Sequence, residues 1–211
     1  MAAYALLGGA VIVGGRCWTG PTEPKDPGEM VSMRWGDFEA TAPRLAALAR
    51  EKVLGPGVVL VGTIRRDGSP RISPIEPFVL DSELWLSMLW RSHKAADLAR
   101  DPRVLVHSIV TSRDGGEGEL KVRGRCRAEE DRGVQERYAD AVSVALGWRP
   151  DVGRMHLYSV DIDSVSYLRY DDATGDQFTV LWPSGGEYVR RSAGGTTLGP
   201  PERADLGLLG S

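Results

Sequence analysis

The chain has 211 residues and a formal net charge of −3, with 26 Lys and Arg against 29 Asp and Glu. Hydrophobic residues make up 42% of it and charged residues 26%, which is ordinary for one soluble globular domain and excludes a collagen, a coiled coil or a wholly disordered chain. The two cysteines, Cys17 and Cys126, lack CxxC spacing, so neither a disulfide framework nor a structural zinc site is indicated. The acidic charge balance also argues against nucleic acid as a partner.

The chain begins with an apolar stretch at residues 2–15 that is too short to span a bilayer and is not preceded by basic residues. Residues 19–29 are rich in Pro, Gly and charge, as linkers are. We therefore expect a disordered extension and linker at 1–32, one folded domain at 33–192 and a mobile tail at 193–211. The alternative for the apolar stretch is a membrane anchor. If the stretch is not an anchor, we expect a cytoplasmic protein that does not contact a membrane.

The first elements expected after the linker are one helix and three strands. Thr41, followed by apolar residues in helical spacing, predicts a capped amphipathic helix that ends at residues 55–57. An Asp-Gly pair at 67–68 and a tight turn at 81–82 then separate three β-rich runs. The sequence thus predicts a meander of three strands at 58–65, 71–80 and 83–90.

The second half of the chain reads mainly as strands. A short helix is expected after Ser92 and a second one at 130–146, with Val134, Tyr138, Ala141 and Ala145 on its apolar face. Residues 119–128 alternate between apolar and basic side chains, as in a half-buried strand. Further strands are predicted at 103–112, 157–170, 177–182 and 187–191. Short turns and few helices favour an antiparallel barrel with helices packed outside it.

Several common catalytic motifs are absent from the sequence: the GxSxG nucleophile elbow, the GxxxxGK phosphate loop, the GxGxxG turn and HExxH. The three histidines, His93, His107 and His156, are far apart and no Cys lies near them at ligand spacing. We therefore expect no metal site.

Two local features point to a ligand site. Residues 71–77 alternate like a strand but contain two prolines, which must interrupt pairing and leave backbone groups free for a flat heteroaromatic ring; a plain edge strand with a bulge is the alternative. At residues 90–95 a strand gives way to a helix whose first turn carries Lys94. A cation at the positive end of a helix suggests a phosphate between them, and a solvated lysine is the alternative.

Three segments in this order, VGTIRRDGSPRISPIEP, LWLSMLW and WRSHKAADLARDPRVLV, resemble the pyridoxamine 5'-phosphate oxidase-like family over residues 54–128. The resemblance implies a mainly β fold with peripheral helices, namely an antiparallel split β-barrel. It also implies FMN as cofactor, a small-molecule substrate, and a homodimer with cofactor sites at the interface.

The resemblance also assigns roles to individual residues. Arg71 would bind the FMN phosphate, the backbone of Ile72, Ser73, Pro74 and Ile75 would face the isoalloxazine edge, and Ser87 and Met88 would contact the cofactor from the next strand. The phosphate would be gripped by Ser92, His93 and Lys94. Glu119 or Lys121 would face the ring from the partner subunit. Independently, Trp90 is placed at the strand end to stack on the ring. No catalytic residue is assigned, because the flavin supplies the chemistry.

The sequence departs from the family pattern in two places. His93 stands where the family usually has Arg, and neither the substrate-binding residues nor the C-terminal Arg-x-His motif of authentic pyridoxamine phosphate oxidases is recognisable. We therefore expect an FMN-binding oxidoreductase acting on an unidentified small molecule rather than on vitamin B6. The alternatives are a reductase dependent on a deazaflavin (coenzyme F-420) and a flavin or haem binding module without turnover.

Overall fold

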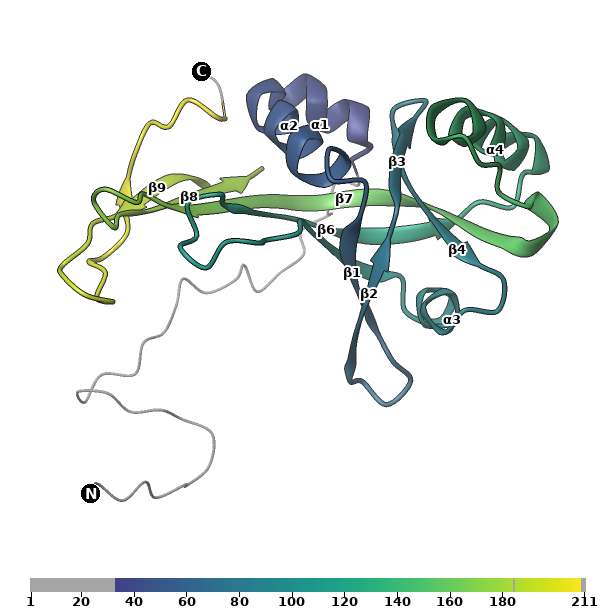
Figure 1. Ribbon diagram of the computed structural model, residues 1–211, viewed down its shortest axis with the longest axis horizontal. Coiled ribbons are helices and arrows are strands. Elements are labelled where there is room, and N and C mark those ends of the chain that lie inside the picture. The colour runs from purple at the N-terminus through teal and green to yellow at the C-terminus, as the bar shows by residue number, and fades with distance from the viewer. Residues whose placement is uncertain (1–32, 184, 210–211) are drawn as a thin grey trace. The chain divides into compact units, whose positions relative to one another are not determined.

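A computed structural model of the chain describes residues 33–183 and 185–209, which fall in one unit, Val31–Ser211 (Figure 1). The extension predicted for residues 1–32 lies outside the described residues. Within the described ranges, no helix is both long and apolar enough to cross a membrane. The cytoplasmic location stays a prediction.

The described residues form ten strands in one antiparallel sheet, which confirms the predicted mainly β class. The main order is β10-β9-β8-β7-β6-β5-β1-β2, and β4 pairs with both β3 and β7. The strand bounds are β1 Val59–Ile64, β2 Pro70–Ile75, β3 Pro77–Leu80, β4 Glu83–Leu89, β5 Arg103–His107, β6 Glu119–Ala128, β7 Met155–Tyr170, β8 Gln177–Trp182, β9 Gly186–Arg190 and β10 Glu202–Arg203.

The long strand β7 organises the sheet. Its first residues pair with β4, its last residues pair with β8, and β6 runs along most of its length. The ladder with β6 shifts register between Arg123 and Gly124, and a Cβ at Gly124 would collide with the carbonyl oxygen of Asp161. A glycine is therefore required at this irregularity of the ladder.

The prolines split the strand predicted at 71–80 into β2 and β3, which are separated by Glu76. Pairing is interrupted there as predicted, and both predicted hairpins form, but the middle strand of the predicted meander is divided rather than continuous. Strand β2 pairs only with β1 among the described strands, whereas β3 and β4 form a separate hairpin that joins β7. The predicted strand at 103–112 ends earlier, at His107, while 119–128 forms β6 with the predicted bounds.

The helices lie outside the sheet (Figure 1). Helix α3 packs against β1 and β4, and α4 packs against β3. The helical elements are α1 Trp35–Thr41, α2 Pro43–Ala49, the π-helical turn η1 Arg50–Leu54, α3 His93–Arg100, α4 Arg132–Leu146 and the 3-10 turn η2 Val152–Arg154.

Two details of the helix predictions are wrong. Thr41 caps nothing: it ends α1, which the sequence did not indicate, and its hydroxyl donates to the carbonyl oxygen of Asp37, while Ala42 precedes α2. In α4 the buried residues are Tyr138, Ala139 and Val142, whereas Ala145 is exposed. The apolar face of α4 is rotated because it covers a small second core around Trp85 rather than the main core.

The main core lies between α1, α2 and the sheet. Trp35, Phe38 and Leu45 are fully buried in it, and the rings of Phe38 and Trp182 lie 4.9 Å apart. In the segment predicted as a tail at 193–211, β10 pairs with β9, and Leu206, Leu208 and Leu209 pack against this core. The mobility of the segment stays a prediction.

Candidate functional site

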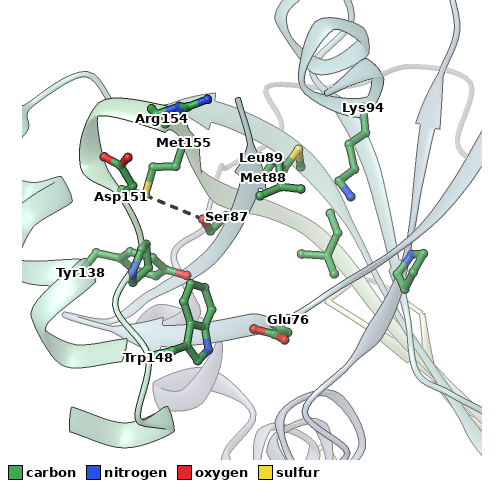
Figure 2. Close-up of a pocket in the computed structure, with 13 residues that line it drawn as sticks. Glu76, Ser87, Met88, Leu89, Lys94, Tyr138, Trp148, Asp151, Arg154 and Met155 are labelled. Carbon is green, nitrogen blue, oxygen red and sulfur yellow. Dashed lines mark hydrogen bonds between the residues drawn. The ribbon is translucent and has the colours of Figure 1, made fainter. Parts of the chain in front are cut away.

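A pocket of about 370 Å³ lies where β2, β4, α3 and the connection between α4 and β7 meet (Figure 2). Of the residues that the sequence places in a cofactor site, it brings together Pro74, Ile75, Ser87, Met88 and Lys94. The other lining residues are Glu76, Leu89, Tyr138, Trp148, Pro150, Asp151, Arg154 and Met155.

The first turn of α3 supplies the pocket with positive charge. As predicted, Ser92 caps the helix, accepting a 3.4 Å hydrogen bond from the backbone N–H of Ala95. The side chain of Lys94 extends from α3 into the pocket (Figure 2) and has no hydrogen-bond or ion-pair partner within residues 33–183 and 185–209. Partial burial lowers the pKa of Lys94 because desolvation disfavours the ammonium form. A half-buried cation without a counter-charge suits an anionic ligand.

Arg71, on β2, is not among the residues that line the pocket. Its Nε donates a 2.6 Å hydrogen bond to Oδ2 of Asp97 on α3, and its side chain is 23% exposed. Asp97, in contrast, is buried. Burial raises the pKa of Asp97, but hydrogen bonds from Arg71, Thr63 and Arg100 outweigh that effect and hold the pKa below its ordinary value.

Trp90 and His93 lie outside the pocket lining. The indole of Trp90 stacks on the imidazole of His156, with ring centroids 4.9 Å apart and an interplanar angle of 13°. The backbone N–H of Arg91 donates to Nε2 of the same histidine at 3.2 Å. His93 is exposed at the start of α3. Neither assigned role, stacking on the ring for Trp90 or gripping phosphate for His93, is tested by this arrangement.

Glu119 and Lys121 on β6 are also outside the pocket lining. They form an ion pair with each other, and Nε2 of His107 lies 3.3 Å from Oε2 of Glu119. Burial raises the pKa of Glu119, but the hydrogen bond and charge of Lys121 and the neighbouring His107 lower it by more. Their predicted place, facing the ring of a partner subunit, stays a prediction.

Much of the pocket wall was missed by the sequence reasoning. Trp148, Pro150 and Asp151 come from the loop after α4, and Tyr138 reaches the pocket from the helix itself (Figure 2). Burial raises the pKa of Tyr138 to about 12, so its hydroxyl remains protonated near neutral pH. The sequence gives one signal for this wall: the segment Gly-Trp-Arg-Pro-Asp at 147–151 has the Gly and Pro of a loop and carries an aromatic ring.

Comparison with known protein families places the chain in one of them. The family model described as pyridoxamine 5'-phosphate oxidase matches residues 45–169, more than half of the chain. The chain belongs to this family, and its antiparallel sheet with a few helices is consistent with the family's split barrel. No curated protein matches the sequence.

Three solved structures are similar to the chain at low sequence identity, and the first of them shares its fold. A Clostridium acetobutylicum protein related to general stress protein 26 of B. subtilis, of the pyridoxinephosphate oxidase family, has a TM-score of 0.51 and 17% identity, covering 65% of this chain and 93% of that chain. A conserved hypothetical protein from Mycobacterium tuberculosis has a TM-score of 0.49 and 20% identity, covering 56% and 81%. A NimC/NimA family protein from C. acetobutylicum has a TM-score of 0.49 and 16% identity, covering 68% and 94%.

Proposed function

We propose that the protein binds FMN in this pocket and uses it for two-electron redox chemistry on a small molecule. The observation that carries the proposal is Lys94: a cation that enters the pocket from the N-terminus of α3 and lacks an anionic partner among the described residues. Family membership supports the same cofactor.

The residues present fit FMN in charge and shape. The backbone N–H groups of His93 and Lys94 at the start of α3 have no acceptor among the described residues, so they and the Lys94 ammonium can receive a phosphate. Strand β2 pairs on one side only, which leaves backbone groups on its other edge for polar atoms of the ring. The buried side chains of Ile75 and Met88 offer an apolar surface to the ring.

When bound, FMN supplies the hydride chemistry, and the chain positions and shields it. The α4–β7 connection forms another wall of the pocket and contributes Trp148, Pro150 and Asp151. This wall would receive the substrate. It carries none of the recognisable substrate residues of authentic pyridoxamine phosphate oxidases, so a different small molecule is the proposed substrate.

We further propose a homodimer with its cofactor sites at the interface. Ile72, Leu89 and Trp90, on or next to the strands that line the pocket, are 69%, 79% and 49% exposed. Large apolar side chains that are exposed on a folded domain are typical of a surface that another chain covers. In such a dimer Glu119 and Lys121 would reach the site of the partner subunit. Size-exclusion chromatography with light scattering tests this, and a monomer at micromolar concentration would contradict it.

Absorbance of the purified protein tests the cofactor. FMN would give a yellow protein with two visible bands, whereas a colourless protein that binds an added deazaflavin would favour the deazaflavin-dependent reductase. Turnover is tested by reducing the bound FMN and adding a panel of electron acceptors. Reoxidation no faster than that of free reduced FMN would favour a binding module without turnover.

A further inference from the structure

One carboxylate joins the two parts of the proposed phosphate site. Asp97 lies on α3, three residues after Lys94, and is 4% exposed. Its Oδ2 accepts hydrogen bonds from Nε of Arg71 at 2.6 Å and from Oγ1 of Thr63 at 3.1 Å. Thr63 and Arg71 are directly opposite each other in the β1–β2 ladder. Both strands of the β1–β2 hairpin thus donate to the same carboxylate oxygen of α3.

The manner in which Arg71 binds Asp97 leaves part of the guanidinium free. Only Nε is used, and the two Nη groups, which carry four further N–H donors, have no acceptor among the described residues. Arg100 completes the group from the next turn of α3, with Nη2 3.4 Å from Oδ1 of Asp97 and 2.5 Å from the carbonyl oxygen of Ile64. The carboxylate is therefore held on both oxygens, and Arg71 is held by one edge.

We propose that Asp97 is a positioning residue for the phosphate site: it orients Arg71 so that the Nη groups face the phosphate bound by Lys94. This inference rests on the proposed FMN function. Lys94 and Asp97 are three residues apart, so they project from the same side of α3, and Asp97 holds the Arg71 guanidinium on that side.

The charges at this corner support a phosphomonoester. Asp97, Arg71 and Arg100 together leave one net positive charge, and Lys94 adds a second. A phosphomonoester carries close to two negative charges near neutral pH. Without Asp97, the same corner would hold three cations and no fixed geometry for Arg71.

A double-mutant cycle of Asp97 and Arg71 tests the proposal. The affinities of each variant for FMN and for riboflavin, which differ only in the phosphate, are measured by titration. Asp97→Asn keeps the size of the side chain but removes the charge that orients Arg71, so we expect FMN affinity to fall about fivefold to tenfold, with riboflavin affinity unchanged. In an Arg71→Ala background, Asp97→Asn should cause no further loss of FMN affinity. An effect that persists in that background would overturn the proposal.

Two further variants separate orientation from folding. Thr63→Val removes the other donor to Oδ2 without touching Arg71, so it should lower the melting temperature and leave the FMN-to-riboflavin affinity ratio unchanged. Arg71→Lys keeps the charge but lacks Nε, and should lose FMN affinity as Asp97→Asn does. FMN binding by Arg71→Lys at the wild-type level would overturn the inference, and so would an equal loss of FMN and riboflavin, or tighter FMN binding, in Asp97→Asn.

The proposed function and this inference fail in different ways. A wild-type protein that binds neither FMN nor riboflavin rejects both. A wild-type protein that prefers FMN, together with an Asp97→Asn variant that keeps the full preference, rejects the positioning role and leaves the proposed function standing.

Discussion

Two of the buried carboxylates in this domain have contrasting partners. Asp97, 4% exposed, is bonded by three side chains from β1, β2 and α3, two of them cationic. Glu187 on β9, 7% exposed, accepts hydrogen bonds from four consecutive backbone N–H groups, those of Leu206, Gly207, Leu208 and Leu209.

The difference in partners distinguishes a carboxylate with a structural role from one that belongs to a proposed ligand site. Backbone donors carry no net charge and have no spare groups, so the Glu187 cluster can do no more than hold residues 206–209 against the sheet. The partners of Asp97 include a guanidinium whose Nη groups have no acceptor among the described residues, and Lys94, three residues earlier on α3, has no anionic partner there either. Changes at Glu187 should therefore affect stability, and changes around Asp97 and Lys94 should affect ligand affinity.

The largest effect is expected from Glu187→Ala. Four partly buried N–H groups lose a charged acceptor, which should cost about 3 kcal/mol of folding free energy. For a domain of this size that corresponds to a fall in melting temperature of roughly 6 to 12 °C, measurable by calorimetry. FMN affinity at a temperature well below the transition should be unchanged. A melting temperature within about 1 °C of wild type would show that residues 206–209 do not depend on this carboxylate.

Lys94→Ala should instead change ligand affinity and leave stability nearly unaffected. Loss of a charged hydrogen-bond donor should weaken FMN binding by about tenfold or more, while riboflavin binding changes little. The melting temperature without ligand should stay the same or rise, because desolvation of an unpaired ammonium opposes folding. Titration of Lys94→Met, which keeps the apolar stem, is the matched control. Equal losses for FMN and riboflavin would remove Lys94 from the phosphate site.

Both carboxylates, Glu187 and Asp97, should make the stability of the fold depend on pH. Burial raises the pKa of Glu187, but the backbone hydrogen bonds from Leu209 and its neighbours lower it below 4.5; Asp97 is likewise lowered below 3.8. Groups with a lowered folded-state pKa stabilise the fold above their unfolded pKa, and this contribution is lost as pH falls through the folded one. Melting temperatures should therefore fall below about pH 4.5, and Glu187→Gln should flatten that fall.

Local patterns predicted the parts of this site that depend on neighbours in sequence. The Ser92 cap and the alternation of β6 follow from residues within one turn or one strand, and the two prolines correctly indicated broken pairing near Glu76. The pairing of β4 with β7 could not be predicted in this way because it joins segments about 70 residues apart.

The same limit explains the residues that were missed. Asp97 follows Lys94 in a short helix and reads as a solvent-exposed charge, and its burial depends on a hairpin that lies earlier in the chain. Trp148 and Arg154 reach the pocket only because α4 packs over β3 and returns the chain to β7. Side chains whose roles arise from packing carry little signal in their own sequence surroundings.

The smallest expected effect is at His93, where the family usually has Arg. His93 is exposed at the first position of α3, one residue before Lys94, and lies outside the pocket lining. An arginine there has a longer, forked side chain that is always charged, so His93→Arg should tighten FMN binding by a few fold and leave riboflavin binding unchanged. A second cation at the positive end of the helix dipole should also lower the melting temperature of the ligand-free protein slightly. Since Asp97 already fixes Arg71 in the proposed site, a gain from His93→Arg would show that the phosphate still has unfilled acceptor positions on the solvent side. Unchanged FMN affinity, with His93→Gln as the neutral control, would show that His93 points away from the phosphate and that Arg71 and Lys94 alone complete the cation set.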